Sequence, residues 1–156
     1  MKKLLIALLV TLPFWGFAQI EKGNWLLGGS ATFSSIKYDG AKERLSSFTF
    51  SPNAGYFLTN HIAVGLDFSV TSRKKFTFIG ANPFGRFYWK KAFIQAKYVT
   101  NTATGNNSSR GFDLSIGRAF FLKPNVAFEP EFYYQSIKGY NDFSDLGLRM
   151  GFQFYW

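Results

Sequence analysis

The chain has 156 residues, of which 21% are aromatic and 17% are charged, and its formal net charge is +9 at pH 7. It contains no cysteine, which excludes disulfides and cysteine metal sites as sources of stability. The mean hydropathy lies near zero, and no apolar run after residue 18 is long enough for a transmembrane helix. A helical membrane protein is therefore excluded, and the uniform composition predicts one compact unit.

The first 18 residues are predicted to be a cleaved export signal. Lys2 and Lys3 precede an almost unbroken apolar run, and Gly16-Phe17-Ala18 has the small-x-small pattern of a cleavage site. A membrane anchor is the alternative, but this run is shorter than the roughly 20 apolar residues that span a bilayer. We therefore expect a signal peptide over residues 1–18 and a mature domain over residues 19–156.

Apolar and polar residues alternate along the rest of the chain, as in strands with lipid on one face. The alternation is clearest over residues 146–156, where one face is wholly apolar and the other carries Arg149, Gln153 and two glycines. The remaining segments with this pattern are 24–36, 45–58, 62–72, 76–89, 92–101, 111–122 and 126–137. Eight strands of at least about 9–11 residues predict an all-β, eight-stranded antiparallel up-and-down transmembrane β-barrel.

Connections and aromatic residues indicate the orientation of the predicted barrel. The connections 59–61, 90–91 and 123–125 are short, those at 38–44, 102–110 and 138–144 are longer, and 72–75 is a short exception on the long side. Short periplasmic turns and long outer loops are typical of outer-membrane barrels. The aromatic residues at the short-turn ends predict one interfacial girdle: Trp25, Tyr56, Phe57, Phe87, Tyr88, Trp89, Phe120, Phe121, Phe154, Tyr155 and Trp156.

Residues 149–156 resemble a barrel-assembly signal, because they follow the order polar-x-Gly-x-x-aromatic-x-aromatic with Gly151, Phe154 and Trp156 at its key positions. Residues 51–57 resemble a strand-to-turn motif of the same proteins. On these residues the chain resembles the OmpA/OmpX-type family of small outer-membrane β-barrels, in the form common in Bacteroidota. The resemblance covers nearly all of the mature chain and implies an outer-membrane location and recognition by the barrel-assembly machinery, but it implies no particular activity.

Alternation from the last strand places a set of charged side chains inside the predicted barrel: Asp67, Arg86, Lys97, Asp113, Glu129, Glu131 and Arg149. Because buried charges are costly unless they are paired, these four acids and three bases predict a hydrogen-bonded network that plugs the lumen. A selectivity constriction in a pore is the alternative, although eight strands leave an interior filled by side chains. The inward direction of Arg86 and Lys97 depends on the fourth strand, which Gly80-Ala81-Asn82-Pro83 interrupts.

Candidate catalytic residues are few. Some small outer-membrane barrels modify lipid A with a histidine, but the single histidine, His61, lies in a predicted periplasmic turn and is interpreted as a turn residue. Glu129 and Glu131 could be the two carboxylic acids of a glycosidase. However, they occupy successive inward positions on one strand, which favours a structural ladder of side chains. The sequence predicts no catalytic residue, no cofactor and no metal site.

Basic residues gather in or beside the predicted outer loops, and Arg73, Lys74 and Lys75 are the main candidates for contacts with the phosphates of lipopolysaccharide. The others are Lys37, Lys42, Arg44, Arg110 and Lys138. A solvated loop surface is the alternative. Nucleic-acid binding is a poor explanation for an exported protein.

The sequence predicts a monomeric, non-enzymatic protein in the outer membrane of a Gram-negative bacterium, with a structural or surface-interaction role at the cell envelope. Its expected partners are outer-membrane lipid, lipopolysaccharide and the barrel-assembly machinery. A small pore is the second hypothesis, and a lipid A-modifying enzyme is the third.

Overall fold

The computed structural model describes residues 20–36, 45–73, 76–103, 108–139 and 143–156. The predicted signal peptide, residues 1–18, lies outside the described residues. In the described part, no helix is long and apolar enough to cross a membrane. The strands are β1 (Trp25–Ile36), β2 (Leu45–Phe57), β3 (Ile62–Arg73), β4 (Phe76–Trp89), β5 (Ala92–Ala103), β6 (Ser108–Arg118), β7 (Phe120–Lys123), β8 (Val126–Gly139) and β9 (Phe143–Tyr155).

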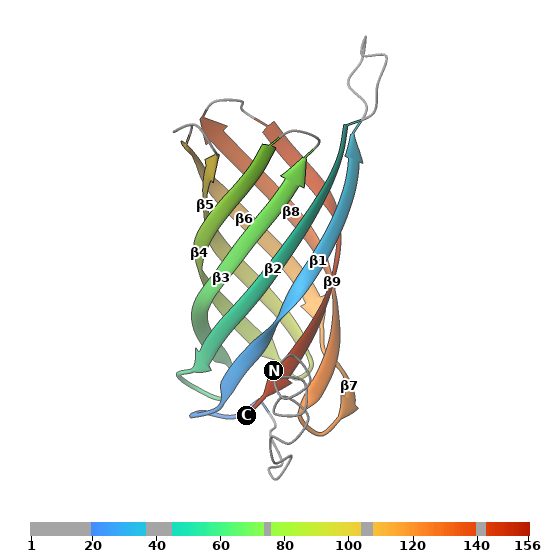
Figure 1. The fold of residues 1–156 in the computed structure, drawn as a ribbon. Helices are drawn as coiled ribbons and strands as arrows, with labels where there is room; N and C mark the ends of the chain where they lie inside the picture. Colours follow the sequence, from blue (N-terminus) through green and yellow to red (C-terminus); the bar gives the residue numbers. More distant parts are fainter. Residues whose placement is uncertain (1–19, 37–44, 74–75, 104–107, 140–142) are drawn as a thin grey trace, which may run out of the picture.

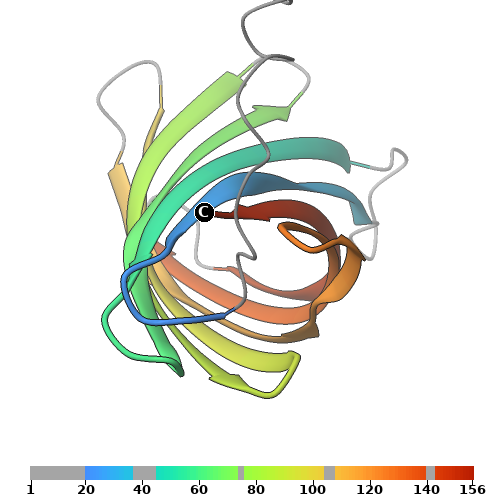
Figure 2. The ribbon, with the colours of Figure 1, turned by 90° about the horizontal axis from the view of Figure 1, so that it is seen from below.

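These strands form one closed antiparallel barrel (Figures 1 and 2). The strands from β1 to β6 pair in chain order, β8 pairs with β9, and β9 pairs with β1, which closes the sheet. β6 and β7 are separated only by Ala119 and both pair with β8, so they act as one interrupted wall strand. The predicted eight-stranded up-and-down barrel is confirmed.

Several strands extend further than the sequence predicts at the barrel end opposite the short turns. β5 continues to Ala103 and β6 begins at Ser108, while β8 continues to Gly139 and β9 begins at Phe143. The connections expected at 102–110 and 138–144 are therefore shorter than predicted. Their polar composition suggests loops, but polar side chains are compatible with antiparallel pairing wherever a sheet faces water.

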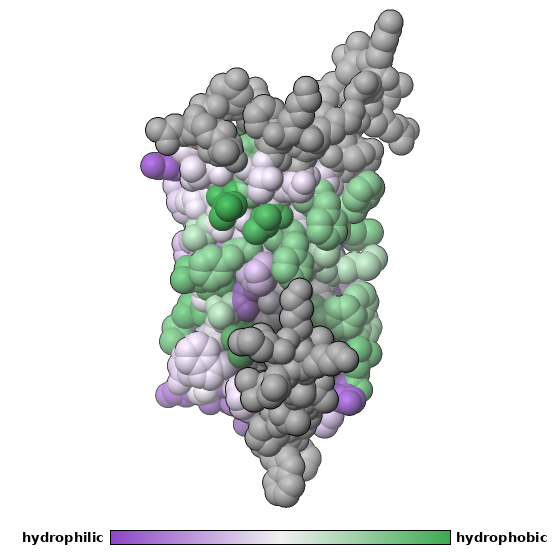
Figure 3. Space-filling view, viewed as in Figure 1, coloured by the Kyte–Doolittle hydropathy of each residue, from purple (hydrophilic) through white to green (hydrophobic). Residues whose placement is uncertain are grey.

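The outer wall of the barrel is apolar along its middle. Leu148 is 66% exposed, Ile79 is 61% exposed and Ile116 is 56% exposed, and they belong to a large set of outward apolar side chains. Figure 3 shows this apolar band across the wall, with hydrophilic residues toward both ends. An exposed apolar surface that surrounds a whole sheet indicates contact with lipid.

β4 keeps its alternation across the interruption at residues 80–83. Backbone pairing between β4 and β5 is absent there and resumes beyond it in the same register. The Asn82 side-chain oxygen accepts a hydrogen bond from the Thr100 backbone amide (2.8 Å), and the Thr100 hydroxyl donates to a β4 carbonyl (2.7 Å). These bonds span the gap, and because the register is unchanged beyond it, Arg86 on β4 and Lys97 on β5 both face the lumen.

Candidate functional site

Side chains are arranged in layers along the barrel interior. At the short-turn end, an apolar group that we call the aromatic plug occupies the lumen, and charged and amide side chains follow it toward the opposite end. The plug consists of Leu26, Phe57, Ala63, Phe84, Tyr88, Phe93, Ala119, Ala127 and Tyr155.

Aromatic rings contact one another across the plug. The ring of Tyr88 lies with its centroid 5.4 Å from both Phe57 and Phe93, and Phe57 lies 6.1 Å from Tyr155. These rings come from β2, β4, β5 and β9, so they join opposite sides of the wall. All four side chains are at most 1% exposed, and they leave little room for water at this level.

The predicted girdle is wrong in part, because Phe57, Tyr88 and Tyr155 point into the lumen instead of toward lipid, and Phe121 packs against the aromatic plug. Each follows or precedes an outward aromatic residue, and side chains one position apart in a strand face opposite sides. Trp89 and Trp156, at 70% and 54% exposed, remain on the outer surface. Aromatic residues at this rim therefore serve two roles, which the strand alternation separates.

Two glycines make room for Phe84, which belongs to the aromatic plug. Gly55 and Gly65 are register partners on β2 and β3, and both face the lumen. A Cβ atom at Gly65 would lie 2.7 Å from the Phe84 ring and 2.2 Å from the Ala54 carbonyl oxygen. A larger residue at Gly65 would therefore displace the ring or separate the strands.

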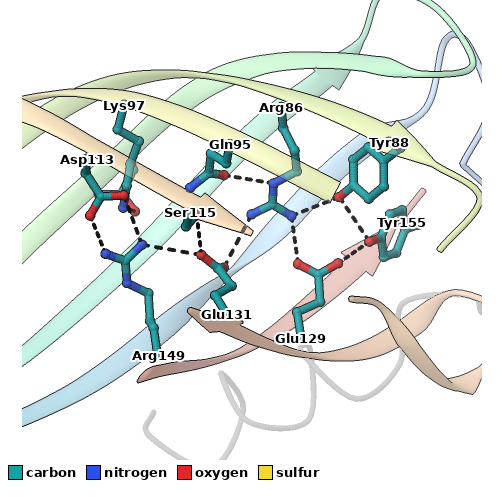
Figure 4. Close-up of polar contacts among 11 residues, drawn as sticks. Arg86, Tyr88, Gln95, Lys97, Asp113, Ser115, Glu129, Glu131, Arg149 and Tyr155 are labelled. Carbon is teal, nitrogen blue, oxygen red and sulfur yellow. Dashed lines mark hydrogen bonds and ion pairs between the residues drawn. The ribbon is translucent and has the colours of Figure 1, made fainter. Parts of the chain in front are cut away.

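Arg86 occupies the centre of the charged layer (Figure 4). Its guanidinium donates to the Gln95 side-chain oxygen (2.8 Å) and to the Tyr88 hydroxyl (2.8 Å). It also pairs with Glu129 at 2.7 Å and lies 4.2 Å from the centroid of the Phe93 ring. The Tyr155 hydroxyl donates to the second oxygen of the same glutamate. The Arg86 guanidinium, the Glu129 carboxylate and the two tyrosine hydroxyls thus meet partners inside the wall.

Glu131 connects Arg86 to the second arginine of the lumen. Its two carboxylate oxygens lie 3.7 Å from an Arg86 nitrogen and 3.4 Å from an Arg149 nitrogen. The Ser115 hydroxyl donates to Glu131 (2.9 Å), and Arg149 also pairs with Asp113. This arrangement runs from β4 through β8 and β9 to β6, so it braces strands that are not neighbours in the sheet.

Lys97 and Asp67 form a third group further along the lumen. The Lys97 ammonium lies 3.5 Å from one Asp67 oxygen, and the Asn82 amide donates to the other oxygen (3.1 Å). Asn82 also donates to the Ser69 hydroxyl (3.0 Å). These contacts connect β3, β4 and β5.

The structure therefore brings all seven predicted lumen charges together in paired groups. Each is at most 6% exposed. Removing a charge from water is costly, and here each is offset by an opposite charge and by hydrogen bonds. Such an arrangement can brace the wall and obstruct passage through the lumen.

Several members of this network were not among the predicted site residues. They are Tyr88, Tyr155, Gln95, Ser115 and Asn82. Strand alternation places Gln95 two positions from Lys97 and Ser115 two positions from Asp113, which was a usable signal. The same alternation places Tyr88 two positions from Arg86 and Tyr155 two positions from Gln153, but both were assigned to the interfacial girdle, where tyrosine is also typical.

A cavity of about 120 Å³ lies beyond the network, toward the end opposite the short turns. Hydroxyl side chains of β1, β2 and β3 form one side, and Tyr133, Ile137 and Val99 lie on the other. Asp67, Lys97 and Arg149 also line it. The lumen is therefore hollow on one side of the network and filled on the other.

Gly151 and Phe154 lie on β9, and Trp156 directly follows this strand. Gly151 is buried in the wall, whereas Phe154 and Trp156 are exposed on the outside at 45% and 54%. Arg73 is the last residue of β3, and Lys74 and Lys75 lie outside the described residues.

His61 lies in the exposed turn between β2 and β3, as predicted. Its backbone carbonyl accepts a hydrogen bond from Tyr88 (2.7 Å), and its ring stacks on Phe87 at 6.2 Å. Among the described residues, no three acidic, histidine or cysteine side chains are arranged to hold a metal ion.

No protein-family model matches the chain, and no curated protein matches its sequence. The crystal structure of Neisserial surface protein A (NspA) matches with a TM-score of 0.62 at 19% identity, over 85% of this chain and 97% of that one. A structure from the de novo design of transmembrane β-barrels matches with a TM-score of 0.52 at 11% identity, over 87% of this chain and 98% of the design. At these identities the likeness concerns the fold alone, and the chain has the fold of a small eight-stranded transmembrane β-barrel.

Proposed function

We propose that this chain is a non-enzymatic outer-membrane protein of the OmpA/OmpX type, with a structural or surface-interaction role at the envelope of a Gram-negative bacterium. The observation that carries the proposal is a lumen closed by the aromatic plug and the paired charges, inside a wall that is apolar on the outside. A closed barrel of this kind offers its rims and its outer wall for interaction, rather than a channel.

The location is supported by the wall and by the fold. Lipid-facing side chains surround the barrel, and exposed tryptophans lie at the short-turn rim, where interfacial aromatic residues are typical of membrane barrels. The likeness to a protein described as a Neisserial surface protein favours the same kind of membrane. The predicted export signal over residues 1–18 is consistent with this destination.

Two contacts outside the barrel belong to the same proposal. Gly151, Phe154 and Trp156 would be recognised by the barrel-assembly machinery, as the order of residues 149–156 indicates. Arg73, Lys74 and Lys75 would meet lipopolysaccharide phosphates beyond the end of β3, because arginine and lysine bind phosphate oxygens through charge-assisted hydrogen bonds.

The purified protein should change its gel mobility on heating. A closed barrel has no free strand edge, so its hydrogen-bonded wall should resist detergent at room temperature and unfold on boiling. Electrophoresis of unheated and boiled samples measures the difference. Identical mobility of the two samples would argue against a stable closed barrel.

Planar bilayers that contain the purified protein should show little or no conductance. The plug and the Arg86 and Arg149 groups occupy successive levels of the lumen, so an ion would have to displace buried, paired side chains. A known channel added to the same bilayer serves as the positive control. Stable openings of uniform size from this protein would instead support the pore hypothesis.

The enzyme hypothesis makes a separate chemical prediction. Lipid A extracted from cells with and without the gene should have the same mass spectrum, because His61, the single histidine, lies in an exposed turn away from the lumen charges. A gene-dependent loss or gain of an acyl chain would show that the barrel modifies lipid A.

A further inference from the structure

Two basic side chains face each other on the outer wall, at the end opposite the short turns. Arg110 on β6 is the direct register partner of Lys138 on β8. Both are exposed, and strand alternation puts them on the same outer face as Phe112 and Tyr134. Like charges directly opposite each other across a strand pair are destabilising, so an anion placed between them would remove a repulsion.

The described residues offer no carboxylate to this pair. The ion pairs within the described part of the chain join lumen side chains. Asp145 on β9 is near the same rim, but it accepts a hydrogen bond from Tyr133 (2.8 Å) and lines the lumen cavity. A negative charge that neutralises the outer pair would therefore come from outside these residues.

Hydroxyl groups adjoin the cations on the outer face. Ser136 is two residues before Lys138 on β8, so it is the adjacent residue on the same outer face. Its register partner is Ser144 on β9. The two serine oxygens are 3.5 Å apart, and the Tyr134 hydroxyl lies 3.4 Å from Ser144. Hydroxyls can donate to oxygens of the same anion that the cations attract.

An aromatic surface lies next to the cations, on the side of the apolar band. The rings of Phe112 and Tyr134 pack with their centroids 6.1 Å apart and are 47% and 40% exposed. Tyr98, the register partner of Phe112 on β5, is 50% exposed on the same face. Charge, hydroxyls and rings therefore follow one another from the rim toward the lipid-facing wall.

We propose that this surface, which we call the rim site, binds the phosphate group of a phosphorylated glycolipid in the outer leaflet. Arg110 and Lys138 contact the phosphate oxygens, the arginine through its planar fork and the lysine as a point charge. Phe112 and Tyr134 contact the acyl chains of the same molecule. The inference rests on the proposed outer-membrane location and adds a ligand class and a binding site to it.

The test uses the full purified protein in detergent micelles and bisphosphorylated lipid A as the probe, with the dissociation constant measured by native mass spectrometry. Changing Arg110→Gln together with Lys138→Gln should weaken binding about tenfold or more, because charge-assisted contacts are lost. The matched control, Arg118→Gln with Lys91→Gln, removes two exposed cations at the short-turn end and should leave binding unchanged. Exchanging the charges as Arg110→Lys with Lys138→Arg should retain most of the affinity.

Two further probes identify the part of the ligand that is recognised. Lipid A without its phosphates should bind weakly, and equally to the wild type and the glutamine variant. Inorganic phosphate at the concentration of the lipid should not compete, because it makes no contact with the rings. Equal binding of dephosphorylated lipid A, competition by inorganic phosphate, or an equal loss in the control variant would overturn the rim site.

Failure of the rim site can be told apart from failure of the proposed function. Each variant is first checked for the change in gel mobility on heating, which reports a folded barrel independently of lipid A. A heat-modifiable wild-type barrel that binds lipid A no better than the glutamine variant rejects the rim site alone. A wild-type protein without a heat-modifiable form rejects the membrane barrel and the rim site together.

Discussion

Replacing Arg86 with alanine should lower the free energy of unfolding of the barrel by about 3–5 kcal/mol, because breaking a buried ion pair leaves its partner unpaired. Arg86 is 2% exposed and pairs with Glu129 at 2.7 Å. Its loss also removes the partner of Gln95 and one contact of Glu131. Urea titration of protein refolded in lipid vesicles, followed by gel mobility, measures the change.

Arg118→Ala is the matched control for this variant. Arg118 is exposed on the outer face of β6, with its guanidinium 5.5 Å from the centroid of the Phe120 ring. The control variant therefore loses the same guanidinium group as Arg86→Ala, but from an exposed position. Its replacement should change stability by no more than about 0.5 kcal/mol. A similar small effect for Arg86→Ala would mean that water hydrates the charged layer, contrary to a closed lumen.

A double variant separates the ion pair from simple packing. Replacing both Arg86 and Glu129 with leucine removes the pair without leaving an isolated charge between them, and such replacements are often nearly neutral. We therefore expect this double variant to be more stable than Arg86→Ala. If the double variant is less stable than Arg86→Ala, the hydrogen bonds that Tyr88 and Tyr155 make to the ion pair stabilise the barrel by more than the free energy needed to bury the two charges.

Replacing Trp156 with alanine should reduce the amount of barrel that reaches the membrane in cells, while refolding in detergent micelles stays close to that of the wild type. The side chain is 54% exposed, so little of its contact area lies within the protein. The backbone amide of Trp156 donates to the Trp25 carbonyl (2.8 Å), and the alanine variant can keep this bond between the chain end and β1. A selective defect in cells would follow from recognition of the side chain by the assembly machinery.

Trp89→Ala provides the comparison for Trp156. Trp89 is 70% exposed at the same short-turn rim and would serve equally well as an interfacial anchor. Quantifying the heat-modifiable form in isolated membranes, and after refolding in micelles, gives both readouts for both variants. Equal losses for the two tryptophans, or a loss in micelles as large as that in cells, would remove the case for a targeting role.

The direction of most side chains could be predicted from the sequence, because residues in a strand alternate between two faces and one face must be apolar to meet lipid. Arg149 and Gln153 alternate with Met150 and Phe152 in the last strand. The structure places Arg149 and Gln153 in the lumen, and Met150 and Phe152 on the outer wall. The same rule reached Arg86 across the interruption at residues 80–83, since the register there is unchanged. Strand number and closure followed from the same pattern.

Other features depended on the closed barrel itself. Arg86 and Glu129 are 43 positions apart, and Arg149 and Asp113 are 36 apart, so no local pattern could select these partners. Which side chains meet across the lumen depends on the strand tilt and stagger that closure imposes.

The division between girdle and plug has the same origin. Phe57, Tyr88 and Tyr155 resemble their outward neighbours in type and in position along the strand. Once eight strands close, their inward rings meet near the barrel axis and fill it. The sequence alone determined a lipid-facing barrel with charges on its inner face. Only the tertiary structure decided that those charges pair across the lumen above an aromatic plug, because the ion pairs and the ring contacts join strands that only closure of the barrel brings together.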